Sequence, residues 1–311
     1  MPTLYVTHSA FTGHDTGAGH PERADRMRAI DAVMGHELFA GLQREDAPEA
    51  DSASLALVHP QSYVDAIRQA APDRGQVYLD GDTLMSPGSL EAALRAVGAG
   101  LRAVDAVMTG EVRNAFCAVR PPGHHAEPMR AMGFCLFSSI AIAGQHARAK
   151  HGAERVAVVD FDVHHGNGTQ AAFWSDKDLF FASTHEMPLY PGTGAIAETG
   201  AADNIVNAPL RSGDGGAQFR AALRDRILPR LTDFRPDIVL ISAGFDAHRD
   251  DPLGNLMLVE EDFAWATAEL LQVAERHSGG RVVSMLEGGY DLRALAGSAA
   301  VHVKTLMEAS A

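Results

Sequence analysis

The chain has 311 residues, 46% of them hydrophobic, with 30 glycines and 26 basic against 40 acidic side chains, which gives a formal net charge of −14 at pH 7. This length accommodates one large α/β domain or two ordinary ones, and the acid excess argues against tight binding to a nucleic-acid backbone while tolerating a cationic substrate. No stretch approaches the roughly 20 apolar residues of a membrane span, and the first residues lack the basic and apolar blocks of a signal peptide, so we expect a soluble, cytoplasmic protein with neither membrane nor nucleic-acid partners.

A short strand is predicted close to the N-terminus, at residues 4–6, and a polar loop follows it at 11–21. The loop is rich in glycine and contains His14 and His20. It is either part of the rim of a site, as functional loops often are, or ordinary turn structure.

Three helices are expected in the N-terminal third of the chain, at 22–38, at 62–71 and after Pro87. The third is the clearest, because its apolar residues lie three or four apart and share one face. These residues are Leu90, Leu94, Val97, Leu101, Val104 and Met108. Ahead of this helix, the turn at 79–83 carries Asp82, which either has a turn or capping role or reaches a substrate.

Beyond residue 110 the chain repeats one arrangement, in which an apolar strand ends in polar or glycine-rich residues. Five such strands are predicted, at 115–119, 156–161, 179–182, 238–241 and 281–286. Helices are expected among them, at 139–150, 217–231, 260–277 and 292–307. Continuous apolar strands alternating with helices indicate an α/β fold with a mostly parallel sheet covered on both faces. No repeat or linker interrupts the pattern, so residues 1–311 are expected to form a single domain.

The strand at 156–161 runs into a cluster of acids and histidines. If the strand continues, alternation places Asp160, Asp162 and His164 on one side and His165 on the other. Buried carboxylates beside an imidazole need either a cation or a network of hydrogen bonds and salt bridges, and this segment alone leaves both open.

A second strand end brings the natural third ligand. In parallel sheets the ligand lies at the carboxyl ends of the strands, so Asp246 is expected to join Asp162 and His164. Three protein ligands with an open position are typical of a catalytic zinc, and oxygen-rich ligation also suits Fe²⁺, Co²⁺ or Mn²⁺.

Candidate acids and bases follow two further strands. His124 and His125 come after a Pro-Pro-Gly bend and are expected to share acid and base work, with Asp160 and Asn167 available to orient them. Tyr290, in a Gly-Gly-Tyr turn, offers a phenolic donor to a developing oxyanion, although such a tyrosine alone would be read as a loop anchor.

Five motifs occur in order along the chain. They are Arg120-Pro-Pro-Gly-His-His-Ala126, Asp160-Phe-Asp-Val-His-His-Gly-Asn-Gly-Thr169, Pro191-Gly-Thr-Gly194, Gly244-Phe-Asp-Ala247 with Asp251-Pro-Leu-Gly254, and Glu287-Gly-Gly-Tyr-Asp-Leu292. Together they resemble the zinc-dependent histone deacetylase family, which also includes acetylpolyamine amidohydrolases and acetoin-utilisation proteins and has the arginase-deacetylase fold. The resemblance runs from about His14 to Leu292, and Asn167, where class I members have an acid, gives it a class II character.

The resemblance implies a role for each catalytic candidate. Asp162, His164 and Asp246 would bind zinc. His125 would be the general base and then the acid, supported by Asn167; His124 would be its electrostatic partner, oriented by Asp160; and Tyr290 would polarise the scissile carbonyl.

The resemblance also implies a substrate tunnel and a second cation. Phe134, which follows Gly133, and Tyr190 would wall an acyl-lysine tunnel, and Asp82 at the rim would hold the substrate backbone. A potassium ion near the zinc would be held by Asp160, Asp162 and Ser183.

Two positions bear on the substrate. Leu253 stands where the polyamine-selective class IIb enzyme has a glutamate, and Tyr290 stands where the nearly inactive class IIa enzymes have histidine. Both favour an active deacetylase of acetylated lysine in peptides or proteins, or of a small acetylated amine. The sequence leaves open whether the protein is a monomer or a homodimer.

Three other interpretations remain. One is an acetylpolyamine amidohydrolase, because bacterial members act on proteins, polyamines or small metabolites. A binuclear manganese ureohydrolase of the same fold is more remote, because few extra ligands are available. A catalytically dead binding module would have lost a ligand or the tyrosine, and neither is lost.

Overall fold

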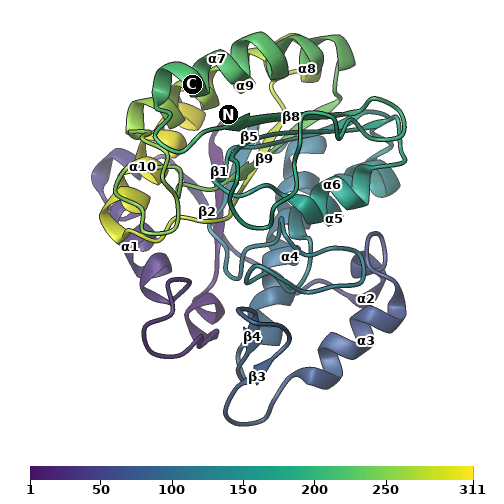
Figure 1. Ribbon diagram of the computed structural model, residues 1–311, viewed down its shortest axis with the longest axis vertical. Helices are drawn as coiled ribbons and strands as arrows, with labels where there is room; N and C mark the ends of the chain where they lie inside the picture. The colour runs from purple at the N-terminus through teal and green to yellow at the C-terminus, as the bar shows by residue number, and fades with distance from the viewer. Residues whose placement is uncertain (311) are drawn as a thin grey trace.

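A parallel eight-stranded sheet forms the centre of the molecule in the computed structural model, which describes residues 1–310 (Figure 1). Its strands stand in the order β2-β1-β5-β10-β9-β6-β7-β8, and every pairing is parallel. Their bounds are β1 Thr3–Thr7, β2 Gln43–Asp46, β5 Asn114–Cys117, β6 Val156–Asp160, β7 Leu179–Glu186, β8 Ile205–Leu210, β9 Ile238–Ala243 and β10 Val282–Leu286. The predicted parallel sheet is thus confirmed.

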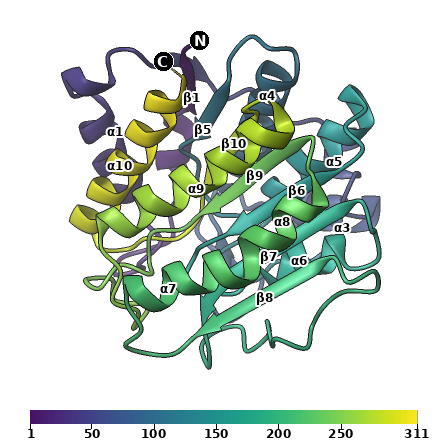
Figure 2. The same ribbon diagram turned by 90° about the horizontal axis from the view of Figure 1, so that it is seen from above.

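Helices cover both faces of this sheet, as expected from its continuous apolar strands. On one face lie α7 (Gly216–Ala222), α8 (Leu228–Phe234), α9 (Glu260–Ser278) and α10 (Leu292–Ser310), seen in front of the strands in Figure 2. On the other lie α4 (Ser89–Met108), α5 (Ser139–His151) and α6 (Asn167–Phe173). The side chains of β5, β6, β9 and β10 are buried along their whole length, so the core lies between the sheet and these two helical layers.

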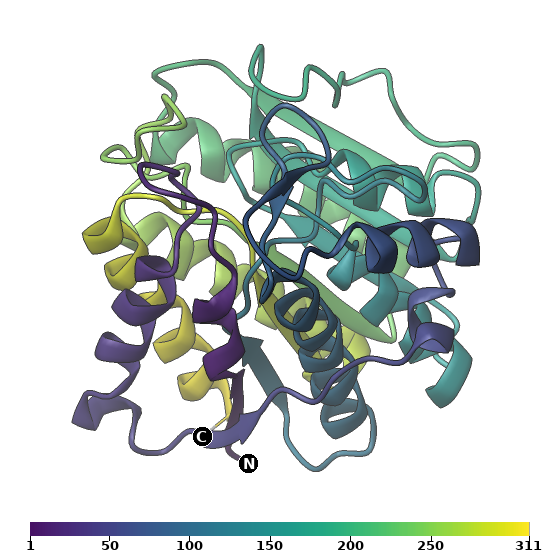
Figure 3. The ribbon, with the colours of Figure 1, turned by 90° about the horizontal axis from the view of Figure 1, so that it is seen from below.

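Smaller elements complete the fold. They are α1 (Asp25–Met34), α2 (Ser52–Leu55), α3 (Gln61–Ala70), the short helices η1 (Ser9–Gly13) and η2 (Glu37–Phe39), and an antiparallel hairpin of β3 (Val77–Tyr78) and β4 (Leu84–Met85). The first and last described residues lie side by side, and the amino group of Met1 donates a hydrogen bond to the carbonyl of Ser310 (Figure 3). Within residues 1–310, the structure contains no helix that is both long and apolar enough to cross a membrane.

The structure corrects several predicted elements. The helix predicted at 22–38 begins only at Asp25, because Glu22 is buried in an ion pair with Arg26 and Arg120, and it stops at Met34. The helix predicted at 217–231 is divided by a π-helical turn at Leu223–Ile227. Strands β2 and β8 at the two edges of the sheet were not predicted.

Candidate active site

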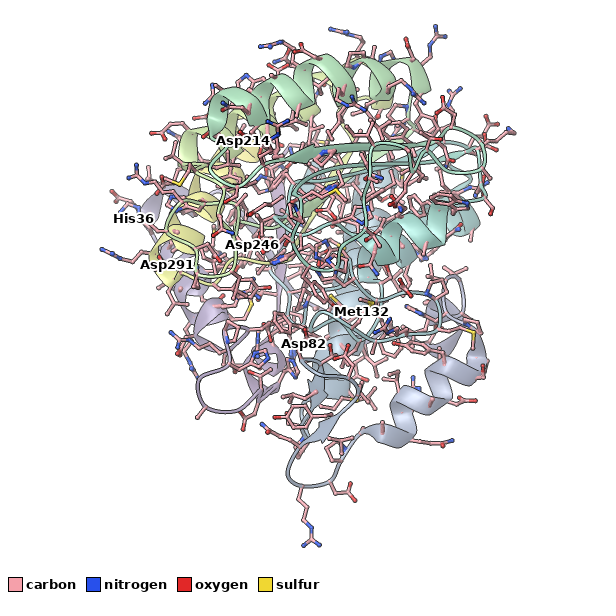
Figure 4. The ribbon with its side chains drawn as sticks, in the orientation of Figure 1. His36, Asp82, Met132, Asp214, Asp246 and Asp291 are labelled. Carbon is pink, nitrogen blue, oxygen red and sulfur yellow. The ribbon has the colours of Figure 1, made fainter. Side chains whose placement is uncertain are left out.

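Three buried ligand-type side chains meet at the carboxyl ends of β6 and β9, which are neighbours in the sheet. Nδ1 of His164 lies 3.1 Å from Oδ1 of Asp162 and 3.2 Å from Oδ2 of Asp246. One nitrogen and two carboxylate oxygens within 4.8 Å of one another fit a divalent metal with three protein ligands, and His164 also faces a cavity, which leaves the fourth position accessible. Figure 4 labels Asp246 near the middle of the molecule.

Electrostatics in this triad also favour a cation. Burial alone would lower the pKa of His164, but its hydrogen bonds to the two carboxylates raise that pKa to about 10. Burial and the charge of Asp162 raise the pKa of Asp246 to about 7. Both shifts favour the protonated form and so reduce the negative charge of the triad. A bound cation would neutralise the two carboxylates directly.

The chain reaches this triad by a route that differs from the predicted one. β6 ends at Asp160, so strand alternation does not place Asp162 and His164. Instead the carboxylate of Asp160 accepts the N–H of Asp162 at 3.0 Å, and that of Asp162 accepts the N–H of His164 at 2.9 Å. Each aspartate thus forms a turn in which its side chain binds the backbone N–H two residues later, as aspartates commonly do. His165 lies apart from the triad, and its Nδ1 is hydrogen-bonded to the hydroxyl of Thr193.

Two adjacent imidazoles stand beside the triad, their ring centroids 4.0 Å apart. Nδ1 of His124 lies 2.9 Å from Oδ2 of Asp160, and Nδ1 of His125 lies 2.8 Å from Oδ1 of Asn167. Burial opposes protonation of both rings, but the charges of Asp160 and Asp162 raise the pKa of His124 well above its usual value. Burial, followed by the neighbouring imidazoles, lowers the pKa of His125 well below its usual value. These opposite shifts favour a protonated His124 beside a neutral His125.

A carboxylate absent from the sequence-based site extends this arrangement. Nδ2 of Asn167 donates to Oε1 of Glu127 at 2.8 Å, so the amide is held with its oxygen toward His125. Glu127 is the residue after the Arg120–Ala126 motif, and only this position next to the motif could have indicated it.

Tyr290 is positioned by two further residues that the sequence did not indicate. The carboxylate of Asp251 accepts the N–H of Tyr290 at 2.6 Å and the N–H of Leu253 at 2.9 Å. The buried guanidinium of Arg26 donates to the carbonyl of Gly289 at 2.6 Å and lies 5.0 Å from the centre of the Tyr290 ring. The sequence places Asp251 in a motif and Arg26 in a predicted helix, and neither position indicates a contact with Tyr290.

A cavity of about 240 Å³ opens onto the triad and gathers the predicted substrate-binding residues. Asp82, Gly133, Phe134, Tyr190 and Leu253 line it together with His124, His125, His164 and Tyr290, and so do Pro122 and Leu189, which were not predicted. Asp82 lies on the hairpin side of this region and is labelled with Asp246 in Figure 4. The walls are largely apolar or aromatic, which suits an unbranched aliphatic chain.

Glycines let the backbone come close to the reacting groups. Gly133 has a φ of 56°, and a Cβ there would collide with the ring of His125. Gly244 and Gly288 press against the triad in the same way: a Cβ on either would collide with a carboxylate oxygen of Asp162 or Asp246. Only glycine fits such positions without moving the ligands.

The two histidines of the polar loop at 11–21 differ in role: one is structural, and the other lies next to the cavity. His14 is buried, with Nδ1 2.6 Å from the Ser89 hydroxyl, so it has a structural role. The ring of His20 packs edge-on against Phe134 at a centroid distance of 4.8 Å, which places it behind the cavity wall.

The residues expected to hold potassium lie close together. Asp160 and Ser183 are paired across β6 and β7, and the Ser183 hydroxyl lies 2.9 Å from Nδ1 of His185. Asp162 follows two residues after Asp160.

Comparison with known proteins identifies the family. The histone deacetylase domain matches residues 20–306. The chain belongs to this family. It is therefore a deacetylase-type hydrolase with a buried metal-binding triad.

Individual relatives of this deacetylase domain come from distant organisms. The chain is 41% identical to the histone deacetylase-like amidohydrolase of Pseudomonas aeruginosa, over 92% of this chain and 75% of that protein. It is 39% identical to the polyamine deacetylase HDAC10 of Homo sapiens, over 98% of this chain and 48% of that protein. The crystal structure of the HDA15 HD domain superposes with a TM-score of 0.93 at 36% identity, covering 100% of this chain and 91% of the other.

Proposed function

We propose that this deacetylase-family hydrolase is zinc-dependent and removes acetyl groups from the ε-amino group of lysine or from a similar small linear amide. The observation that carries the proposal is the cavity itself. Its lining is largely apolar or aromatic and also includes His164 of the triad, His125 and Tyr290. A metal ligand, a candidate base and a candidate hydroxyl donor in the wall of one cavity support the proposal, because hydrolysis of an amide requires these three groups.

Zinc is the metal proposed for Asp162, His164 and Asp246, with Fe²⁺ or Co²⁺ as alternatives that the same donors accept. When bound, zinc in a three-ligand site lowers the pKa of water and polarises a carbonyl. Potassium is proposed at Asp160, Asp162 and Ser183, where it would offset negative charge at the foot of the site.

The proposed chemistry depends on proton transfer by His125. Its Nδ1 is engaged with Asn167, so Nε2 is free to take a proton from the attacking water and then to give it to the leaving amine. His124, held by Asp160, keeps its proton and supplies positive charge beside it. Burial raises the pKa of Tyr290 well above its usual value, so its hydroxyl stays protonated and can donate to the carbonyl oxygen as negative charge develops there.

Substrate binding is proposed to follow the cavity walls. Phe134 and Tyr190 would enclose the apolar stem of lysine and exclude water. Asp82 at the rim would accept a backbone N–H of the substrate.

An acetylated polyamine is the second candidate substrate. It is supported by Asp82 in the cavity lining, by the neighbouring Asp80, whose carboxylate accepts the N–H of Asp82, and by the 39% identity to a polyamine deacetylase. Leu253 in the wall argues for the acyl-lysine substrate, because an uncharged side chain there offers no attraction to a second ammonium group. A binuclear ureohydrolase is disfavoured, since within residues 1–310 the strand ends offer one ligand triad.

The proposal is tested by metal analysis and by rates on three substrates, namely an acetyl-lysine peptide, trifluoroacetyl-lysine and acetylputrescine. We expect one zinc at the triad, the highest kcat/KM on an acyl-lysine substrate, and a fall of about 10²- to 10³-fold for Tyr290→Phe, as for loss of an oxyanion donor. Tyr78→Phe removes the same hydroxyl from an exposed tyrosine of the hairpin and should be silent. A higher kcat/KM on acetylputrescine would establish the alternative, and full activity in both Tyr290→Phe and His125→Ala would end the proposal.

A further inference from the structure

A second cluster of ligand-type side chains lies away from the cavity, where helix α4 packs against α5. Nε2 of His146 lies 2.8 Å from Oδ1 of Asp105, and Nε2 of His151 lies 2.7 Å from the same oxygen. Asp105 comes from α4, and the two histidines come from α5. Two imidazoles from one helix thus converge on one carboxylate oxygen of another, with all three ligand atoms within 4.8 Å of one another.

The donors in this cluster suit a transition metal. Two imidazole nitrogens and one carboxylate oxygen are ligands that Zn²⁺, Co²⁺, Ni²⁺ and Cu²⁺ accept. Metal-ligand bonds of about 2.0 to 2.2 Å in a tetrahedron hold ligand atoms roughly 3.3 Å apart. The nitrogen-oxygen distances of 2.8 and 2.7 Å in the cluster therefore need to open by only about half an ångström. In the active-site triad the two nitrogen-oxygen distances are 3.1 and 3.2 Å.

The three side chains of the cluster are partly buried, so they are held in place but can be reached by a metal ion from solvent. The side chains of His146 and His151 are 11% and 14% exposed and that of Asp105 is 27% exposed, so the ligand atoms are held by packing yet open to solvent on one side. Burial alone would raise the pKa of Asp105, but its hydrogen bonds with Lys150, His151 and His146 lower that pKa to about 2.

Lys150 is the main competitor for this carboxylate. Its ammonium lies 2.7 Å from Oδ2 of Asp105 and leaves Oδ1 to the histidines. The lysine side chain is 55% exposed, so it can swing into solvent at little cost. A salt-bridge network built for packing alone would be weakened by removal of Lys150, whereas a metal site would be strengthened by it.

We propose that Asp105, His146 and His151 form a second metal site, which takes a divalent transition cation such as Zn²⁺ and clamps α4 to α5. The site has three protein ligands, and its fourth position faces solvent. The cation has a structural role, because the cluster lies outside the residues that line the substrate cavity.

The test uses the full chain with Zn²⁺ alone as the probe, and equilibrium dialysis with metal analysis as the readout. An Asp246→Asn background weakens the active-site triad, so that the second site is counted separately. We expect one tightly bound equivalent there, a rise in melting temperature on adding Zn²⁺, and a loss of affinity of more than about 100-fold in His146→Ala/His151→Ala, since even changes in groups that only support metal ligands cost up to that much.

Two further variants make the outcome decisive. Lys150→Ala should bind Zn²⁺ more tightly, and His277→Ala, which removes a histidine from the last turn of α9, should bind it unchanged. If the double histidine variant does not fold, Asp105→Asn provides the same comparison. The proposal is overturned if Zn²⁺ binding survives loss of the ligands, or if Lys150→Ala lowers stability without any gain in Zn²⁺ affinity.

Discussion

Glu127 offers the sharpest test of how the general base is oriented. Its carboxylate accepts a hydrogen bond from Nδ2 of Asn167, whose oxygen faces Nδ1 of His125. Without this acceptor the amide can turn over and present its NH₂ to His125, which favours the tautomer that carries its proton on Nε2 and cannot act as a base. Glu127 thus acts only by favouring the orientation of the Asn167 amide in which the oxygen faces His125.

The size of the effect follows from the bond that is lost. A hydrogen bond to a charged acceptor contributes about 1.5 to 3 kcal/mol, and the partial exposure of Glu127 places this one at the lower end, at about 1.5 kcal/mol. Glu127→Ala should therefore lower kcat on an acetyl-lysine peptide about tenfold. KM should stay unchanged, because Glu127 does not line the cavity.

Two controls separate orientation from other effects. Glu127→Gln keeps an oxygen that can accept the Asn167 N–H, so it should retain most of the activity. In an Asn167→Ala background, Glu127→Ala should have no further effect, because its only proposed route to His125 is gone. Equal losses from Glu127→Ala in both backgrounds would refute the reasoning, as would a wild-type kcat in the single variant.

Three further predictions follow from buried contacts. Asp251→Ala should lower kcat by about 100-fold and reduce the melting temperature, because the N–H groups of Tyr290 and Leu253 lose a charged acceptor. Asp251→Asn should give values of kcat and melting temperature between those of Asp251→Ala and the wild type. Burial lowers the pKa of His59 from 6.5 to about 4, so the unfolded chain takes up this proton first as the pH falls. The free energy of unfolding, measured by urea denaturation, should therefore keep the full contribution of His59 above about pH 6.5 and lose about 3 kcal/mol toward pH 4. His59→Gln should remove most of this dependence of stability on pH. Chelation should abolish activity and lower the melting temperature, and adding Zn²⁺ should restore both in the wild type. In Asp246→Asn the activity should not return, and a wild-type melting temperature insensitive to chelation would contradict this prediction.

The fold was predictable where burial leaves a strong pattern. β6 and β9 are continuous apolar runs, since both of their faces are covered by helices. β2 reads Gln-Arg-Glu-Asp and is half exposed at the edge of the sheet, so no hydrophobic period reveals it. β8 contains Pro209 and lies at the other edge, where a proline is tolerated but weakens the strand signal.

The site was predictable only in part. Side chains that follow buried strands, such as His164 and Asp246, could be placed together because the carboxyl ends of parallel strands meet. Glu127 and Asp251 could not, because they act on an amide and on backbone N–H groups, and such contacts leave no periodic pattern. The cluster at Asp105 depends on which faces of two helices pack together, which appears only in three dimensions.

The glycines that press against the triad set limits on how this enzyme can change. Any larger residue at Gly244 or Gly288 would push a ligand carboxylate out of place, so substitutions there are expected to be eliminated before they can alter specificity. Leu189 and Leu253 lie in the cavity wall, where a new side chain alters what the substrate meets without touching the ligands. New substrate preferences, whether evolved or engineered, should therefore arise in the walls while the floor stays constant.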